Sequence, residues 1–185
     1  ELAKIFSQKE GVRKPLSVEK RRDGMLMAKI STAGSAVIPV VLLMRALGIE
    51  NDQEIFQAIA GPTETFKFIV ANINEVKDNK EYEVETTEEA HLWLEKKFAQ
   101  GQQREYREAR VIQLLDRELL PHLGDGEEDR KKKAIFLGRI VRQVLEMAIT
   151  DRQPNDKDHY ANKRVRLAGD LFEDLFRVSL NGLAR

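Results

Sequence analysis

The sequence contains no cysteine among its 185 residues. This absence excludes disulfide bonds, cysteine-ligated zinc sites and a thiol nucleophile. Long apolar runs are also missing: the longest, residues 36–44, is about half of the roughly 20 residues that a membrane-spanning helix needs, and it contains Pro39. The N-terminus has no signal-peptide pattern. We therefore expect a cytoplasmic protein without a membrane segment.

Neither sign of charge is in excess, since 31 basic residues balance 31 acidic ones. A chain without net charge is not a general polyanion binder, so any contact with nucleic acid must come from a local basic patch. Hydrophobic residues make up 42% of the chain, which is enough for a core. The length suits one domain, or one domain and a piece of another. The chain starts at Glu1 without a methionine, so we expect a piece of a longer polypeptide.

Catalytic motifs are absent as well. The sequence has no Ser-His-Asp pattern, nucleophile elbow, phosphate-binding loop or dinucleotide-binding glycine motif. Its three histidines have no second histidine three or four residues away, so we expect hydrogen-bonded or solvated side chains: His91, His122 and His159. The sequence thus predicts no active site, no metal and no cofactor in this chain.

The spacing of apolar residues predicts an α+β, mostly helical fold. An N-terminal β-hairpin or small antiparallel sheet covers residues 12–30, with a turn at Asp23-Gly24, where glycine accepts a positive φ. Six or seven helices follow, separated by a small-residue loop at 32–35 and a polar loop at 74–85. The predicted helices cover residues 36–48, 51–59, 66–73, 86–98, 106–120, 126–149 and 167–183. We expect the first to be buried nearly all round, with Pro39 in its first turn.

Two groups of basic residues are weaker candidates for contact with nucleic acid. Arg21 and Arg22 stand beside the hairpin turn, where a projecting tip touches DNA or merely keeps a strand soluble. Arg130 and Lys131 open the run of four cations at residues 130–133. This run is either a solvated first turn of a helix or a phosphate-facing patch, and only two of its four side chains can face one backbone.

A third basic group precedes the last predicted helix. Cations at a helix N-terminus cost about 0.3–1 kcal/mol each, yet a helix start with added lysine and arginine is a good anion site. Two alternatives remain open here: a phosphate-facing site, or a salt-bridge cluster that holds the loop. The cations are Lys163, Arg164 and Arg166, and the acidic or amide residues expected to cap the helix and pair with them are Asp156, Asp158 and Asn162.

The same block resembles a known family. Its order Asp156-x-Asp158-His159-x-x-Asn162-Lys163-Arg164 is similar to a block in the second-largest subunits of multisubunit RNA polymerases. Residues 38–48, with the order Ile-Pro-aliphatic-Arg-Ala-Leu-Gly, resemble a segment of the archaeal and eukaryotic versions. Residues 119–123, 133–138 and 177–180 are similar to further stretches of the family. The compact Arg164-Val165-Arg166 favours an archaeal member, and Ala161 departs from the family, which commonly has glycine there.

The resemblance implies the non-catalytic lobe of a DNA-directed RNA polymerase, a nucleotidyltransferase whose magnesium lies elsewhere. Residues 1–155 would form the lobe domain and residues 156–185 the start of the return segment into the protrusion. The lobe would form part of the DNA cleft wall and a docking surface for other polymerase subunits and transcription factors. Four residues would lie near downstream or non-template DNA: Asp158, Lys163, Arg164 and Arg166.

Two other functions remain open on the residues alone. One is a stand-alone helical adaptor that binds protein only, and the other is an independent DNA-binding module. A DNA-binding module is expected to carry one strongly basic face, whereas the basic groups here are scattered and balanced by acid.

Overall fold

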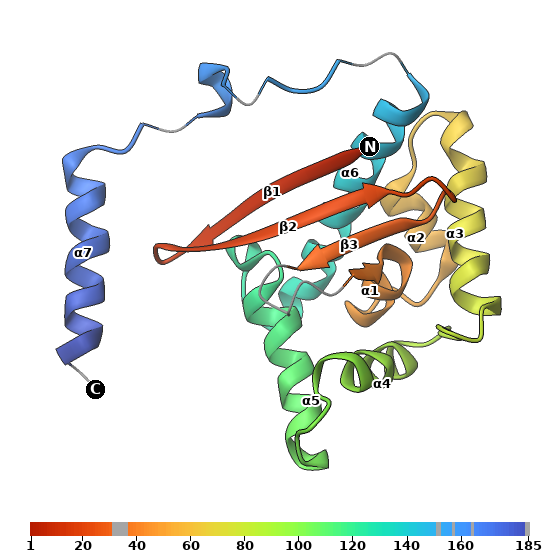
Figure 1. Ribbon diagram of the computed structural model, residues 1–185, viewed down its shortest axis with the longest axis horizontal. Helices are drawn as coiled ribbons and strands as arrows, with labels where there is room; N and C mark the ends of the chain where they lie inside the picture. The colour runs from red at the N-terminus through yellow and green to blue at the C-terminus, as the bar shows by residue number, and fades with distance from the viewer. Residues whose placement is uncertain (31–36, 151–152, 157, 164, 184–185) are drawn as a thin grey trace.

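The computed structural model describes residues 1–30, 37–150, 153–156, 158–163 and 165–183 (Figure 1). Within these ranges a four-stranded antiparallel sheet in the order β1-β2-β3-β4 precedes seven α-helices, so the predicted α+β, mostly helical class is confirmed. The strands are β1 (Leu2–Lys9), β2 (Val12–Lys20), β3 (Leu26–Ile30) and β4 (Val37–Pro39). The helices are α1 (Val40–Ala46), α2 (Asp52–Ile59), α3 (Phe66–Asp78), α4 (Thr87–Phe98), α5 (Arg104–Gln113), α6 (Arg130–Ile149) and α7 (Ala168–Leu183).

The sheet begins one strand earlier than the sequence predicts. β1 pairs with β2 up to Lys9 and Val12, and the connection is Glu10-Gly11, with φ of 51° and 79°. Positive φ at both central residues is typical of a type I′ turn, whose twist suits a two-residue hairpin. The small antiparallel sheet that the sequence predicted as one alternative therefore extends beyond residues 12–30, and Glu10-Gly11 is the sequence signal for the additional strand.

The predicted hairpin at residues 12–30 is confirmed as β2 and β3, with a longer turn than expected. Residues 21–25 join the strands, and Gly24 has the positive φ that its place in the turn requires, 91°. The carboxylate of Asp23 accepts a hydrogen bond from the Met25 N–H at 2.9 Å. Asp23-Gly24 is thus one part of a five-residue loop, and the predicted loop at 32–35 lies outside the described residues.

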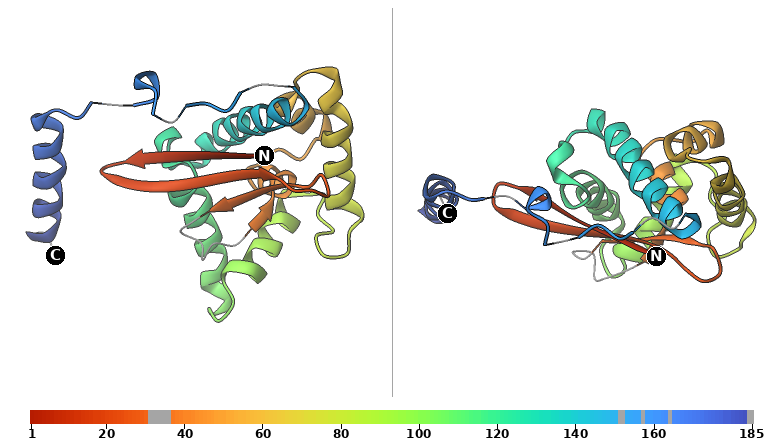
Figure 2. Two further views of the ribbon diagram at one scale, coloured as in Figure 1. Left: turned by 45° about the horizontal axis from the view of Figure 1, so that its top comes forward. Right: turned by 90° about the horizontal axis from the view of Figure 1, so that it is seen from above.

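Apart from α7, the helices gather on one side of the sheet (Figure 2). The inner face contacts α1 and α6, and the buried residues of strands and helices form one hydrophobic core. All seven residues of α1 are buried, as predicted. The helix begins only at Val40, however, because residues 37–39 form β4 and Pro39 is the boundary between strand and helix.

Two further predicted helix limits are wrong. α3 continues to Asp78, so the first part of the predicted loop at 74–85 is helical, because Val76 faces the core. The predicted helix at 106–120 is split into α5 and a π-helical turn at Leu114–Glu118. The wider turn leaves the carbonyls of Leu115 and Asp116 to accept hydrogen bonds from the Lys133 side chain, at 2.9 and 2.5 Å.

Helices α2 and α6 cross at Gly138. A Cβ atom built on Gly138 would lie 2.5 Å from the carbonyl oxygen of Ala58 in α2. Only glycine permits this approach, so the backbone of α2 rests directly on α6.

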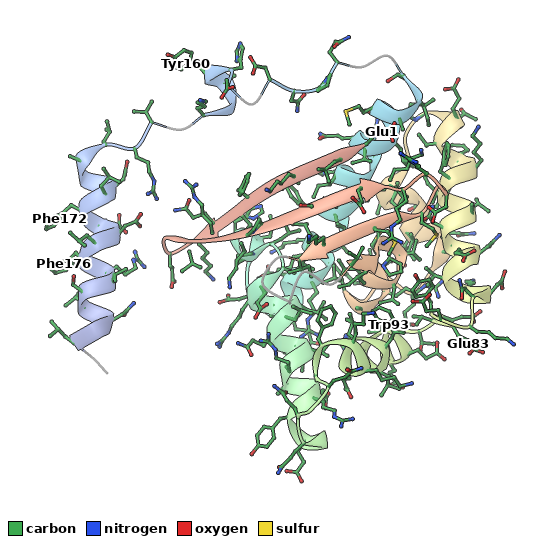
Figure 3. All side chains as sticks on the ribbon, viewed as in Figure 1. Glu1, Glu83, Trp93, Tyr160, Phe172 and Phe176 are labelled. Carbon is green, nitrogen blue, oxygen red and sulfur yellow. The ribbon has the colours of Figure 1, made fainter. Side chains whose placement is uncertain are left out.

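The C-terminal part of the chain leaves the body of the fold (Figure 1). The described residues between α6 and α7 form no α-helix or strand and contain one 3-10 turn at Tyr160–Asn162. On α7, Phe172 and Phe176 stack with ring centroids 5.9 Å apart and are exposed (Figure 3). The helix therefore has an apolar face that the described residues do not cover.

Candidate nucleic-acid interface

The basic segment before α7 is exposed, and acidic side chains accompany its described cations. The Lys163 ammonium lies 3.4 Å from the Asp158 carboxylate, as the sequence predicts. The Arg166 guanidinium pairs with Asp174 of α7 at 2.7 Å. Arg164 lies outside the described residues. The predicted salt-bridge cluster is thus confirmed for Lys163 and Asp158.

The expected capping of α7 by the upstream acids is wrong. The Leu167 N–H at the helix start donates to the Asp170 carboxylate at 3.0 Å. Asp156 instead accepts a hydrogen bond from the Asp158 N–H at 2.8 Å, which stabilises the turn before the segment. The upstream acids are separated from the helix start by Lys163 and residues 165–167, which belong to no helix.

Arg21 and Arg22 lie in the connection between β2 and β3, and both are exposed. The Arg21 guanidinium is 3.8 Å from the Glu19 carboxylate, a distance at the limit of an ion pair. Arg22 has no carboxylate partner among the described residues. This pair is therefore accessible at the surface.

The run at residues 130–133 divides into three kinds of environment. Arg130 makes a bidentate pair with the largely buried Asp116, at 2.8 and 2.9 Å, and this pair raises the pKa of its guanidinium. Lys131 is exposed, and Lys132 pairs with Asp129 at 2.6 Å. Lys133 is fully buried. The interpretation as a solvated first turn is thus wrong for Arg130 and Lys133, whose side chains hold α6 against the π-helical turn.

Burial lowers the pKa of Lys133 to about 8. Between about pH 8 and the usual lysine pKa, the unfolded chain binds the proton that the folded chain has lost, so stability rises with pH. We expect the free energy of unfolding to rise by about 1 kcal/mol per pH unit between pH 8 and 10, relative to a Lys133→Met variant. Urea titrations of both proteins at several pH values measure this difference, and parallel pH profiles would contradict it.

Each histidine has a hydrogen-bond partner in the fold, as expected. His122 Nδ1 is 2.7 Å from the hydroxyl of buried Ser7, and burial lowers the pKa of the imidazole. His91 Nε2 contacts the Ala46 carbonyl at 2.9 Å, and His159 Nδ1 accepts the Ala161 N–H at 3.1 Å. The described parts of the chain contain no group of three or more histidine or acidic side chains suited to a metal ion. Across the same ranges, no helix is both long enough and apolar enough to span a membrane.

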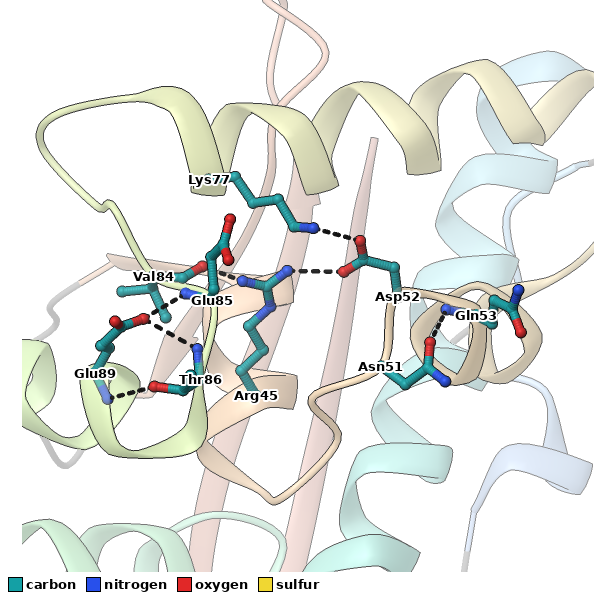
Figure 4. Close-up of polar contacts among 9 residues, drawn as sticks. All are labelled: Arg45, Asn51, Asp52, Gln53, Lys77, Val84, Glu85, Thr86 and Glu89. Carbon is teal, nitrogen blue, oxygen red and sulfur yellow. Dashed lines mark hydrogen bonds and ion pairs between the residues drawn. The ribbon is translucent and has the colours of Figure 1, made fainter.

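A buried polar cluster that the sequence did not single out surrounds Arg45 (Figure 4). Its guanidinium donates to the carbonyl of Val84 and to the carboxylate of Asp52, the latter at 2.8 Å. Lys77 donates to the other oxygen of Asp52 at 2.5 Å, and Thr87 donates to the Arg45 carbonyl at 3.0 Å. The cluster links α1, α2, α3 and the start of α4, so it serves the scaffold. In the sequence, this cluster is indicated by Arg45 itself, which is a cation inside the apolar run that precedes Gly48.

The predicted basic groups do not form one face. They lie on the β2–β3 connection, at the start of α6 and before α7, which are separate parts of the fold (Figure 1). The basic residues are therefore divided among several separate places on the surface of the core and do not form one basic face, as the zero net charge predicts.

Known proteins are similar to the whole chain. The family model RNA polymerase Rpb2, domain 2 matches residues 5–166. The chain is 42% identical over 186 residues to the DNA-directed RNA polymerase subunit Rpo2N of Methanococcus vannielii, covering 100% of the chain and 36% of that protein. It is 43% identical over 190 residues to Rpo2N of Halobacterium salinarum, covering 100% and 35%. With Rpo2 of Saccharolobus solfataricus the identity is 39% over 183 residues, covering 99% and 16%. The chain thus spans about a third of the first two relatives.

Proposed function

We infer, because this chain belongs to the RNA polymerase Rpb2, domain 2 family, that it acts as the lobe of the second-largest subunit of an archaeal DNA-directed RNA polymerase. The match to the family over residues 5–166 carries this proposal. According to this proposal, the chain has a non-catalytic role in transcription and is located in the cytoplasm. The catalytic residues and magnesium of the enzyme lie in other parts of the polymerase.

The proposed role is to form part of the DNA cleft wall and a docking surface for other subunits and transcription factors. A continuous core supports this role, because it holds exposed loops in fixed positions. We retain the predicted division into a lobe domain at residues 1–155 and a return segment at 156–185. A stand-alone adaptor and an independent DNA-binding module are the alternatives.

We propose that the segment around Lys163 faces non-template or downstream DNA. Both described cations are paired with carboxylates at the surface, where an ion pair contributes about 0–1 kcal/mol. A phosphate can replace such a carboxylate at little cost. Asp158 would then orient the Lys163 ammonium in the absence of DNA.

We expect Lys163→Ala combined with Arg164→Ala to destabilise the open complex of the assembled polymerase without unfolding the subunit. Each lost phosphate contact reduces the slope of log affinity against log salt by about 0.9, so the double variant should lose about 1.8. The measurement is open-complex lifetime at several salt concentrations. Lys80→Ala, an exposed lysine between α3 and α4, is the matched control and should leave the slope unchanged.

Three outcomes would count against the proposal. An unchanged salt slope in a folded double variant would show that these cations do not contact phosphate. Unfolding of the variant would favour the purely structural salt-bridge cluster. Tight, sequence-selective DNA binding by the isolated chain would favour the independent DNA-binding module.

A further inference from the structure

Besides the segment around Lys163, the unpaired edge of β1 is a second candidate binding surface. In the sheet order β1-β2-β3-β4, β1 is an edge strand of eight residues, whereas the opposite edge, β4, has only three. A long edge strand presents unpaired N–H and C=O groups that template pairing with another chain. Proteins commonly cover or interrupt such an edge, so an open edge strand of this length indicates a binding surface for a partner.

The register shows which backbone groups face outward. The Lys20 N–H donates to the Glu1 carbonyl at 3.0 Å, so this pair exchanges hydrogen bonds across the hairpin. Hydrogen-bonded pairs alternate along an antiparallel ladder, so every second residue of β1 points its N–H and C=O away from β2. Pro15 supports this assignment: it has no N–H and stands opposite Phe6. The outward-facing residues are Leu2, Lys4, Phe6 and Gln8.

The side chains of these same residues lie on the outer face of the sheet, away from α1 and α6. Leu2 is 55% exposed and Phe6 is 60% exposed, although both are large and apolar. A new strand paired with this edge would place its own side chains beside them. The edge therefore offers both backbone hydrogen bonds and apolar area.

The outer face beside this edge is basic. Lys4 stands opposite Ser17, which in turn stands opposite Lys29, and Arg13 stands opposite Gln8. Lys4, Arg13 and Lys29 are exposed, and no carboxylate of the described residues lies within ion-pair distance of them. The ring of Phe6 lies under the Lys4 ammonium, 5.2 Å from its centroid. Among the described residues of β1, β2 and β3, Glu19 is the acid whose side chain alternates onto this face, and it is already close to Arg21.

We infer that the free edge of β1 binds an extended acidic segment of a protein partner, which adds a fifth strand to the sheet. An acidic residue of that segment lies beside Lys4, and apolar residues two positions away lie beside Leu2 and Phe6. Backbone pairing of this kind supplies affinity, and alternate side chains supply specificity. A phosphate backbone fits less well, because it offers acceptors only and leaves the outward carbonyls of β1 without donors.

This inference rests on the proposed function, since the partner would be a factor or small subunit that docks on the lobe. Its test is independent of transcription. The probe is a fluorescent synthetic peptide of about ten residues in which glutamate and valine or phenylalanine take turns at every second position, with threonine between them, so that acidic and apolar side chains share one face of the strand. Its anisotropy is measured with the purified chain of 185 residues, so a failure here leaves the open-complex prediction untouched, and the reverse also holds.

The expected result has three parts. The peptide binds, and N-methylation of the amides on its bonding edge weakens binding about tenfold, which corresponds to about 1.4 kcal/mol. Replacing its glutamates with lysine weakens binding to a similar degree. Lys4→Glu reverses this preference, whereas Lys96→Glu, a change at an exposed lysine of α4, has no effect.

Amide hydrogen exchange in the assembled polymerase completes the test. The outward amides of Lys4 and Phe6 should exchange freely in the core enzyme and become protected when the peptide is added. Protection before addition would overturn the inference, because another part of the enzyme would already occupy the edge. Insensitivity to N-methylation, combined with competition by a single-stranded oligonucleotide, would overturn it in favour of a nucleic-acid surface.

Discussion

Replacing Arg45 with alanine is expected to lower the free energy of unfolding by about 3–5 kcal/mol. The side chain is 0% exposed and connects the Val84 carbonyl with the Asp52 carboxylate. Its removal leaves a buried carbonyl without a donor and opens a cavity beside α1. Urea denaturation of the chain, followed by circular dichroism, measures the loss.

Lys77→Ala is the matched control for this variant. Lys77 donates to the same carboxylate, but its side chain is 29% exposed, so water can replace it. Its loss should cost about 1 kcal/mol or less. If Arg45→Ala were no more harmful than Lys77→Ala, the buried guanidinium would contribute no more than an ordinary surface charge.

The sequence predicted those helix limits that are set by local contacts. The helix predicted at 86–98 is confirmed as α4, where Thr86 and Glu89 form a capping box. Hydrogen bonds from the Glu85 and Thr86 N–H groups lower the pKa of the Glu89 carboxyl. The helix predicted at 51–59 is likewise confirmed as α2, and Asn51 caps it by accepting the Gln53 N–H at 2.9 Å. Such caps involve side chains and backbone groups only a few residues apart, so helix limits of this kind can be predicted from a single sequence.

The environments within the run at residues 130–133 were not predictable. Four consecutive cations resemble a solvated helix turn, and the partners of the buried one are Leu115 and Asp116, at sequence separations of 18 and 17. The Leu115 carbonyl lacks its usual donor because the π-helical turn directs the Leu119 N–H to Leu114, and the Asp116 carbonyl lies in the last turn of the helix. A pattern of side chains does not reveal where a backbone carbonyl will lack its usual donor.

The candidate site also contains one contact that the sequence predicted and others that it did not. The pairing of Lys163 with Asp158 followed from five residues of separation and opposite charge. The role of Asp170 at the start of α7 did not, because the upstream acids offered an equally plausible cap. The free edge of β1 was missed together with its strand, since its outward backbone groups follow from a register that only the paired structure defines.

Replacing Gly138 with alanine is expected to lower the free energy of unfolding by about 3 kcal/mol, the upper end of the usual range for overpacking. In an open helix the same change stabilises by about 1 kcal/mol, because alanine is the better helix former. Here the added Cβ would lie 2.5 Å from the Ala58 carbonyl oxygen and 2.7 Å from its carbon. Both are backbone atoms, so α2 as a whole must move away from α6.

Gly169→Ala separates the steric effect from helix propensity. Gly169 also lies in a helix, α7, and a Cβ atom there would meet nothing within 4 Å. Thermal and urea unfolding should therefore show a large loss for Gly138→Ala and none for Gly169→Ala. Equal behaviour of the two variants would mean that α2 shifts along α6 without cost. The close approach would then have no part in holding together the core on which the proposed docking surface depends.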